Sequence, residues 1–266
     1  MKKLKKFFKY FIPPVFYNTN RSLLIPPIIN INKWKNLFEK KNKKSKNFQF
    51  PNKIKYKKLN TANINSNFNI KLVDYLRNFN HQGGIVASEN KFIYMKPGKT
   101  AGTSIFHHIL RKKISNILHY RINNQNYSKW LNNLNSDNLS NYFIFTVVRN
   151  PFDRVVSICA YFNITIDNFI KNYNQKKLNE QLFLHSIPLS KYNFIDNTQF
   201  TNYVCKFESL DTDLNFVFNK LDLDVTDIPH VNKTYRSEYQ EYFNREQIDQ
   251  IYEIYEDDFK NFGYSF

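Results

Sequence analysis

The sequence predicts an α/β domain, built on a central parallel sheet flanked by helices, that follows a basic N-terminal extension. Two apolar runs, Phe92-Ile-Tyr-Met95 and Tyr142-Phe-Ile-Phe-Thr-Val-Val148, each stop at a turn and lead into a helical pattern. The second run is apolar on both faces, as a buried parallel strand is. The lysine-rich residues 1–68 have little periodicity, which predicts an extension and linker ahead of a single domain over 69–266.

The other elements follow in chain order from their patterns. Apolar residues at helical spacing predict a helix over residues 103–113, between the two apolar runs. A further β-prone run predicts a strand over residues 203–207. The last element is a helix predicted from Arg245 to Lys260, with Asn244 as its cap and Gln247 in the reciprocal position.

The composition of the 266 residues limits the class of protein only loosely. Lys+Arg 39 against Asp+Glu 22 gives a net charge of +17, which indicates anionic partners, an AT-rich genome or both. Nucleic acid, a phosphorylated cofactor and an anionic membrane surface would all suit such a charge. Cys159 and Cys205 lie in apolar stretches without metal-ligand spacing, so we expect neither a disulfide scaffold nor a metal site.

The N-terminal segment MKKLKKFFKYFIPPVFY combines lysines with aromatic residues and is interrupted by Pro13 and Pro14. It is far shorter than the ~20 apolar residues that span a bilayer. It also lacks a small-residue cleavage site, so an interfacial anchor is favoured over a signal peptide, and a simple packing arm is the common alternative. We expect a cytoplasmic protein, peripheral at the inner membrane face, with a lumenal Golgi-type location left open.

The first motif is the loop Lys96-Pro-Gly-Lys-Thr-Ala-Gly-Thr-Ser104, between the first strand and the first helix of the domain. Its glycines let the backbone approach a ligand, and the free N–H groups of the following helix favour an anion. Lys99, Thr103 and Ser104 add a cation and two hydroxyls. A Walker A loop would need glycine where Ile93 stands, so the motif predicts a P-loop-like fold without the ordinary ATP pattern. A capped turn without a ligand is the alternative.

The second motif begins where the central strand ends. Arg149 follows that strand, Pro151 presets the turn into a helix, and Ser157 lies on an early turn of this helix. The fork of donors on Arg149 and the Ser157 hydroxyl can therefore face one anion. We expect Asp153 and Arg154 to pair with each other or to brace the start of the helix.

Both motifs resemble segments of the PAPS-dependent carbohydrate sulfotransferases, a sulfotransferase family 2-like pattern (PAPS is 3′-phosphoadenosine 5′-phosphosulfate). The sequence Lys-x-Ala-Gly-Thr-Ser is similar to the family's 5′-phosphosulfate-binding loop, and residues 147–157 are similar to its 3′-phosphate-binding segment. Residues 203–210 resemble its F-x-x-R-F-E-x-L segment, with Lys206 where arginine is usual. Residues 230–234 and 252–264 resemble its closing segments, so the resemblance covers about 91–266.

The resemblance implies PAPS as sulfuryl donor, a hydroxyl of a carbohydrate as acceptor, and no metal. It implies that Arg149 and Ser157 bind the 3′-phosphate and that Lys99 is a catalytic cation at the leaving group. The 5′-phosphosulfate would be held by Lys99, Thr100, Ala101, Gly102, Thr103 and Ser104.

An acceptor hydroxyl needs a general base, for which histidine is suited near neutral pH. His119 lies between the two motifs, much as family members place their base, and we predict that it is the catalytic base. His185, in a His-Ser-Ile-Pro segment that resembles a substrate-side segment of the family, is the alternative. His107 and His108 are expected on the surface or in packing.

Two other functions compete with this interpretation. A nucleotide-dependent phosphotransferase would use Lys99 and Arg149 on ATP, but it needs Mg²⁺ and a carboxylate at a strand end, and the sequence offers no convincing one. A nucleic-acid-binding module would explain the net charge and the aromatic content, 18 Tyr and 26 Phe. No helix-turn-helix, zinc-finger or RNP-like pattern supports it, so we expect no nucleic-acid partner.

Overall fold

The computed structural model describes residues 66–79, 83–111, 117–120, 139–223 and 237–266, all within the compact unit Lys57–Phe266. The predicted extension over 1–68, except for its last three residues, lies outside the described residues, as does the segment 230–234. The membrane anchor and the linker therefore stay predictions. No described helix combines the length and the apolar character needed to cross a bilayer.

The main sheet confirms the predicted α/β class and adds two strands to its parallel core. It has the order β3-β1-β2-β4-β7, with bounds Ile117–Tyr120, Gly84–Ala87, Phe92–Met95, Phe143–Val148 and Tyr203–Lys206. β2, β4 and β7 are parallel, as predicted, whereas β1 is antiparallel to both β2 and β3. The sheet is mixed because only a short turn joins β1 to β2, and such a turn allows only antiparallel pairing. β3 therefore runs in the same direction as β2.

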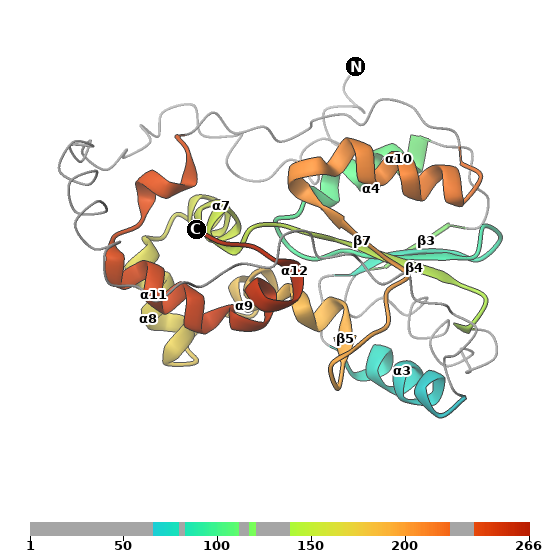
Figure 1. The fold of residues 1–266 in the computed structure, drawn as a ribbon, viewed down its shortest axis with the longest axis horizontal. Coiled ribbons are helices and arrows are strands. Elements are labelled where there is room, and N and C mark those ends of the chain that lie inside the picture. The colour runs from blue at the N-terminus through green and yellow to red at the C-terminus, as the bar shows by residue number, and fades with distance from the viewer. Residues whose placement is uncertain (1–65, 80–82, 112–116, 121–138, 224–236) are drawn as a thin grey trace, which may run out of the picture. The chain divides into compact units, whose positions relative to one another are not determined.

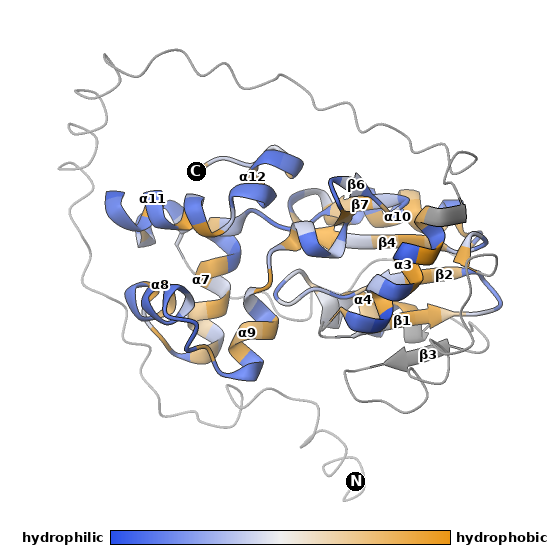
Figure 2. Cartoon of the chain, turned by 90° about the horizontal axis from the view of Figure 1, so that it is seen from below, coloured by the Kyte–Doolittle hydropathy of each residue, from blue (hydrophilic) through white to orange (hydrophobic). Residues whose placement is uncertain are grey.

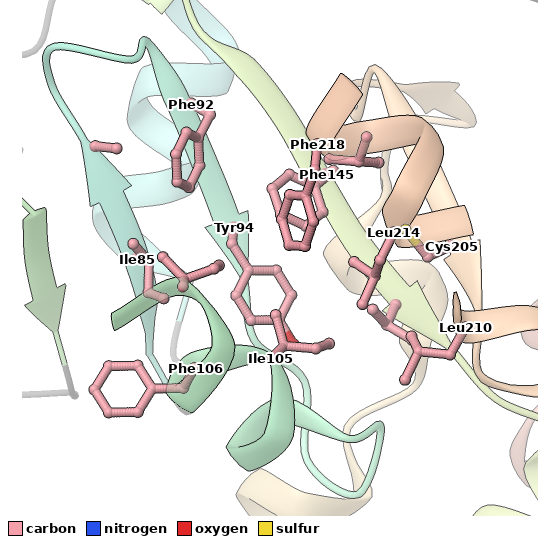
Figure 3. Close-up of a cluster of buried hydrophobic side chains, with 14 residues drawn as sticks. Ile85, Phe92, Tyr94, Ile105, Phe106, Phe145, Cys205, Leu210, Leu214 and Phe218 are labelled. Carbon is pink, nitrogen blue, oxygen red and sulfur yellow. The ribbon is translucent and has the colours of Figure 1, made fainter. Parts of the chain in front are cut away.

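Alternate strand residues supply the two faces of the sheet. On one face, α4 (Gly102–Arg111) and α10 (Leu210–Lys220) cover a core in which the Tyr94 and Phe145 rings stack at 5.1 Å (Figures 1 and 3). On the other face, Ile93 and Ile144 pack with α3 (Ser66–Asn78). β2 and β4 are thus buried on both sides, which for β4 the apolar run of residues 142–148 predicted.

A third core lies among the helices at the end of the sheet where α7 follows β4 (Figure 1). Its members are α7 (Pro151–Phe162), α8 (Ile166–Asn174), α9 (Glu180–Ser186), α11 (Arg245–Ile254) and α12 (Glu256–Phe262). Phe152 is fully buried at its centre. Colouring by hydropathy is mostly hydrophilic on α8 and α11 and hydrophobic on β1 and β2 (Figure 2). α8 and α11 therefore expose a hydrophilic face and bury an apolar face in the core around α7.

The described structure also has several short elements. They are the 3-10 turns Leu189–Tyr192, Phe207–Ser209 and Tyr239–Tyr242, and the two-stranded hairpin of β5 (Phe194–Ile195) and β6 (Thr198–Gln199).

The prediction of one helix from Arg245 to Lys260 is wrong: the chain forms α11 and α12 with a break at Tyr255, whose φ and ψ are −118° and 28°. The predicted capping box of Asn244 and Gln247 is confirmed. The break has a tertiary cause, because it turns two buried side chains toward the segment 186–190. The Tyr255 hydroxyl donates to the Ser186 carbonyl at 3.0 Å, and Asp258 accepts from two backbone amides of the same segment.

Candidate active site

The two predicted motifs follow neighbouring parallel strands. Met95, the last residue of β2, pairs with Thr146 of β4, so the loop after β2 and Arg149 after β4 lie at one edge of the sheet. The carboxyl ends of parallel strands are where α/β folds bind ligands. Pro151 occupies the first turn of α7 and the Asn150 side chain caps that helix, as the predicted turn requires.

The loop after β2 has an unusual backbone. Lys99 and Ala101 have φ values of 65° and 61°, in the left-handed region that few non-glycine residues occupy. Interspersed left-handed residues turn consecutive N–H groups to one side, as anion-binding loops do. Thr100 is fully buried between them and its hydroxyl donates to the Pro97 carbonyl at 3.0 Å. The Thr100 side chain therefore stabilises the strained shape of the loop. Because its hydroxyl is used in this way, the group that Thr100 can offer to a ligand is its backbone amide.

Gly102 opens α4 under the side chain of Lys96. A Cβ atom at residue 102 would lie 2.6 Å from Cε and 2.7 Å from Cγ of Lys96. Glycine is needed here because any side chain would displace this lysine. Beyond it, Thr103 is exposed and Ser104 is buried on the first turn of α4. Of the two predicted hydroxyl donors, Thr103 is the one that faces solvent.

Two arginines of the second motif hold consecutive carbonyls of the first. Arg149 Nη1 donates to the Lys99 carbonyl at 3.0 Å, and Arg154 Nε donates to the Gly98 carbonyl at 3.1 Å. Our expectation for Asp153 needs a correction, since it does not pair with Arg154 but accepts from Arg149 Nε at 2.6 Å. Arg154 does brace the helix start, through the loop. The two motifs thus form one hydrogen-bonded unit.

The face of α7 that carries Ser157 is turned toward the loop after β2 and toward Arg149. Asp153, Ser157 and Tyr161 follow one another at intervals of four residues and share one side of the helix. At one end of this row Asp153 contacts Arg149, and at the other the Tyr161 ring lies 4.2 Å below Lys99 Nζ. The half-buried Ser157 lies between them on the helix, so it faces the side on which α7 contacts Arg149 and Lys99.

The surroundings of Lys99 alter its acidity. Burial first, and the nearby Arg149 second, lower the pKa of Lys99 from 10.5 to about 8. The Arg149 guanidinium is itself fixed, with its Cζ 4.1 Å from the centre of the Phe207 ring. Two adjacent cations at a partly buried edge are an unfavourable arrangement that an anionic ligand would relieve.

His185 reaches the same region from α9. Its Nδ1 lies 2.8 Å from the Gln181 carbonyl, which can only accept, so the neutral ring carries its hydrogen on Nδ1 and Nε2 is the basic nitrogen. Its ring stacks on Tyr161 at 5.4 Å and meets Phe162 edge-on at 5.0 Å. Burial lowers the pKa of His185 to about 4, with Lys99 and Arg154 acting in the same direction. His185 is therefore neutral at physiological pH.

His119 is placed only by its backbone, because its side chain lies outside the described residues. It is the last residue but one of β3 and pairs with Ile85 of β1. The next residue, Tyr120, pairs with Gly84, which in turn pairs with Met95. Because β3 runs in the direction of β2, the backbone of His119 lies near the edge that carries both motifs. His107 is half-buried, and the buried His108 stacks on Phe218 at 5.1 Å, which is a packing role.

Tyr161 and the full role of Arg154 did not emerge from the sequence. Tyr161 had a signal, since it follows Ser157 by four residues on a predicted helix and so belongs to the same face. No sequence pattern indicated the contacts of Arg154, because they are made with segments that are remote in sequence.

Comparison with known protein families agrees with this geometry. The sequence profile of the Sulfotransferase family matches residues 82–265, a span that includes both motifs and every strand of the main sheet. The chain belongs to the sulfotransferase family. The resemblance inferred from the two motifs is confirmed, and the sulfotransferase match extends from ahead of β1 to the penultimate residue of the chain. No curated protein and no solved structure matches this sulfotransferase.

Proposed function

We propose that this sulfotransferase moves the sulfuryl group of PAPS to a hydroxyl of a carbohydrate. The observation that carries the proposal is the contact between Arg149 and Lys99, which joins the two motifs predicted to bind anions, at neighbouring strand ends. PAPS has an anionic group at each of two positions, a phosphosulfate at 5′ and a phosphate at 3′. Membership of the sulfotransferase family supports a donor of this kind.

The chain has the groups that such a donor requires. The loop amides of residues 99–102, the hydroxyls of Thr103 and Ser104, and the ammonium of Lys99 would hold the 5′-phosphosulfate. Arg149 and Ser157 would hold the 3′-phosphate, the group that distinguishes this donor from ATP. When bound, PAPS supplies the sulfuryl group and a phosphate leaving group.

The residues of the chain then have distinct tasks. Lys99 places positive charge where the leaving phosphate becomes more negative, an interaction that strengthens in the transition state. Arg149 positions the loop through the Lys99 carbonyl while its charge attracts the donor. A neutral histidine takes the proton of the acceptor hydroxyl. We propose His119 for this role, with His185 as the alternative.

The acceptor is proposed from the resemblance to carbohydrate sulfotransferases. The His185-Ser-Ile-Pro segment resembles a substrate-side segment, and the structure brings it close to Tyr161 and Lys99. Leu189, which follows Pro188, is fully buried and its amide donates to Asp258 at 2.8 Å. The Leu189 side chain therefore lies in the core and would not contact an acceptor.

The test is incubation of the full chain with sulfur-labelled PAPS and a panel of glycans in the presence of EDTA. We expect labelled glycan to form without added metal. Calorimetry on the same preparation should find that 3′,5′-adenosine bisphosphate binds much more tightly than ADP. Equal affinities for the two nucleotides would contradict the assignment of the 3′-phosphate site, and a requirement for Mg²⁺ with ATP would favour a phosphotransferase.

A further inference from the structure

Among the residues that the structure describes, Arg154 is the largest fully buried side chain, with 1% of its surface exposed. It bonds three main-chain carbonyls: Nε donates to Gly98 at 3.1 Å, and Nη2 donates to His185 at 2.7 Å and to Ile187 at 2.9 Å. Gly98 belongs to the loop of residues 96–104 after β2, called the donor loop below, whereas His185 lies in the last turn of α9 and Ile187 is its C-cap. One guanidinium therefore connects two segments that are remote from each other in sequence.

The segment 185–190 has further buried support from α12. Asp258, which is fully buried, accepts from the amides of Leu189 at 2.8 Å and Ser190 at 2.7 Å. Burial raises the pKa of Asp258, while Arg154 and these two amides oppose the rise. A carboxylate and a guanidinium thus hold the same segment from two sides, one through its N–H groups and the other through its carbonyls.

We propose that Arg154 is a positioning residue that fixes the donor loop relative to the segment 185–190. The proposal rests on the proposed function, in which the loop carries the catalytic Lys99 and the segment borders the acceptor. Lys99 directly follows Gly98, so a shift of the Gly98 carbonyl moves the ammonium. In-line transfer depends on such placement, because an error of about 1 Å can cost roughly 10²-fold in rate.

Arginine suits this task better than lysine. Its planar guanidinium presents donors in fixed directions, so Nε can bond one segment while Nη2 bonds the other. A lysine ammonium is a single point on a flexible stem and cannot occupy both positions. Arg154→Lys therefore keeps the buried positive charge but loses the connection.

Hydrogen exchange of the ligand-free protein tests the connection without reference to activity. We expect Arg154→Lys to speed exchange in both 98–104 and 183–190. Tyr255→Phe is the matched control, since it removes a buried hydrogen bond to the Ser186 carbonyl but leaves Arg154 on the loop. Its faster exchange should be confined to 183–190. An unchanged loop in Arg154→Lys, or a loop opened equally by Tyr255→Phe, would overturn the proposal.

Kinetics with PAPS provide the second measurement. Arg154→Lys should lower kcat by about 10- to 100-fold while the affinity for 3′,5′-adenosine bisphosphate changes less than about threefold, since Arg149 and Ser157 remain. Tyr255→Phe should keep kcat within about threefold. If the kcat of Arg154→Lys equals that of Tyr255→Phe, Arg154 has a purely structural role and the proposal is wrong.

The proposal can still be tested if Arg154→Lys does not fold or if the wild-type protein is inactive with PAPS. If Arg154→Lys does not fold, the double variant Arg154→Gln with Asp258→Asn removes both buried charges together, so that neither is left uncompensated. We expect it to show the same faster exchange in the loop. If the wild-type protein transfers nothing from PAPS, the proposed function fails, but the exchange measurement still decides whether Arg154 connects the two segments.

Discussion

Arg149 donates a hydrogen bond of 3.0 Å from Nη1 to the carbonyl oxygen of Lys99, 50 residues earlier in the chain. The residue proposed for the 3′-phosphate therefore also shapes the loop proposed for the 5′-phosphosulfate. Substitutions at the two residues should not act independently, because directly bonded residues rarely have additive effects.

Arg149→Ala should weaken binding of 3′,5′-adenosine bisphosphate by about 1.5–3 kcal/mol, the value of a hydrogen bond to a charged group. It should also lower kcat, because the Lys99 carbonyl loses its donor. Ser157→Ala is the comparison: it should weaken binding by about 0.5–1.5 kcal/mol and leave kcat unchanged. Calorimetry and steady-state kinetics separate the two effects. Unaltered binding in Arg149→Ala would place the 3′-phosphate elsewhere.

The lowered pKa of Lys99 predicts a basic limit to activity. Lys99 is an ammonium below about pH 8 and a neutral amine above it, so kcat/KM for PAPS should fall as the pH rises through about 8. In Lys99→Arg this fall should vanish, because a guanidinium stays charged. Lys99→Ala should depress kcat more than donor affinity. A profile of the wild type that stays flat to pH 10 would remove the ammonium from the mechanism.

Tyr161→Leu should lower kcat/KM by roughly 5- to 30-fold, corresponding to the 1–2 kcal/mol of a partly desolvated cation–π contact. The physical reason is that the Tyr161 ring lies 4.2 Å from Lys99 Nζ and restricts where the ammonium can go. Tyr161→Phe retains the ring and should stay within about twofold of the wild type. If the two variants are equally impaired, the hydroxyl rather than the ring is responsible.

The sequence predicted the parts of the site that depend on local pattern. The strands β2, β4 and β7 and the loops after β2 and β4 follow from apolar runs that stop at turn residues, and the Asn244 capping box follows from spacing alone. The strands β1 and β3 were not predicted. Each has four residues, as β2 and β7 have, so the difference is not one of length. β1 pairs antiparallel with both β2 and β3, an arrangement that depends on contacts across the sheet rather than on local pattern.

The remaining features depend on contacts between distant segments. The break at Tyr255 exists because its hydroxyl reaches Ser186, 69 residues away. Arg154 was expected to pair with Asp153 or to brace the start of the helix, and the sequence did not indicate that it would do the latter by bonding Gly98, 56 residues earlier. No periodicity or propensity encodes which carbonyl a buried guanidinium will meet.

The two candidate bases predict different acidic limits to activity. A base must be neutral to accept the acceptor's proton, so the rate falls as the pH drops through the pKa of that histidine. For His185 the fall would come near pH 4, because burial has lowered its pKa to about that value. A rate of the wild type that begins to fall well above pH 4 would therefore come from a group other than His185.

Variants at the two histidines decide the assignment. We expect His119→Ala to keep its affinity for 3′,5′-adenosine bisphosphate while turnover falls by roughly 10²–10⁴, the usual scale of general acid–base catalysis, and to lose the acidic limb of the rate profile. His185→Phe keeps an aromatic ring against Tyr161 and Phe162 and should retain turnover within about tenfold, because its role would then be packing. The opposite pattern, full turnover in His119→Ala and loss in His185→Phe, would transfer the base to α9, where Nδ1–H on the Gln181 carbonyl already presents Nε2 as the basic nitrogen. Sulfuryl transfer would survive that outcome, since it changes only which nitrogen receives the proton.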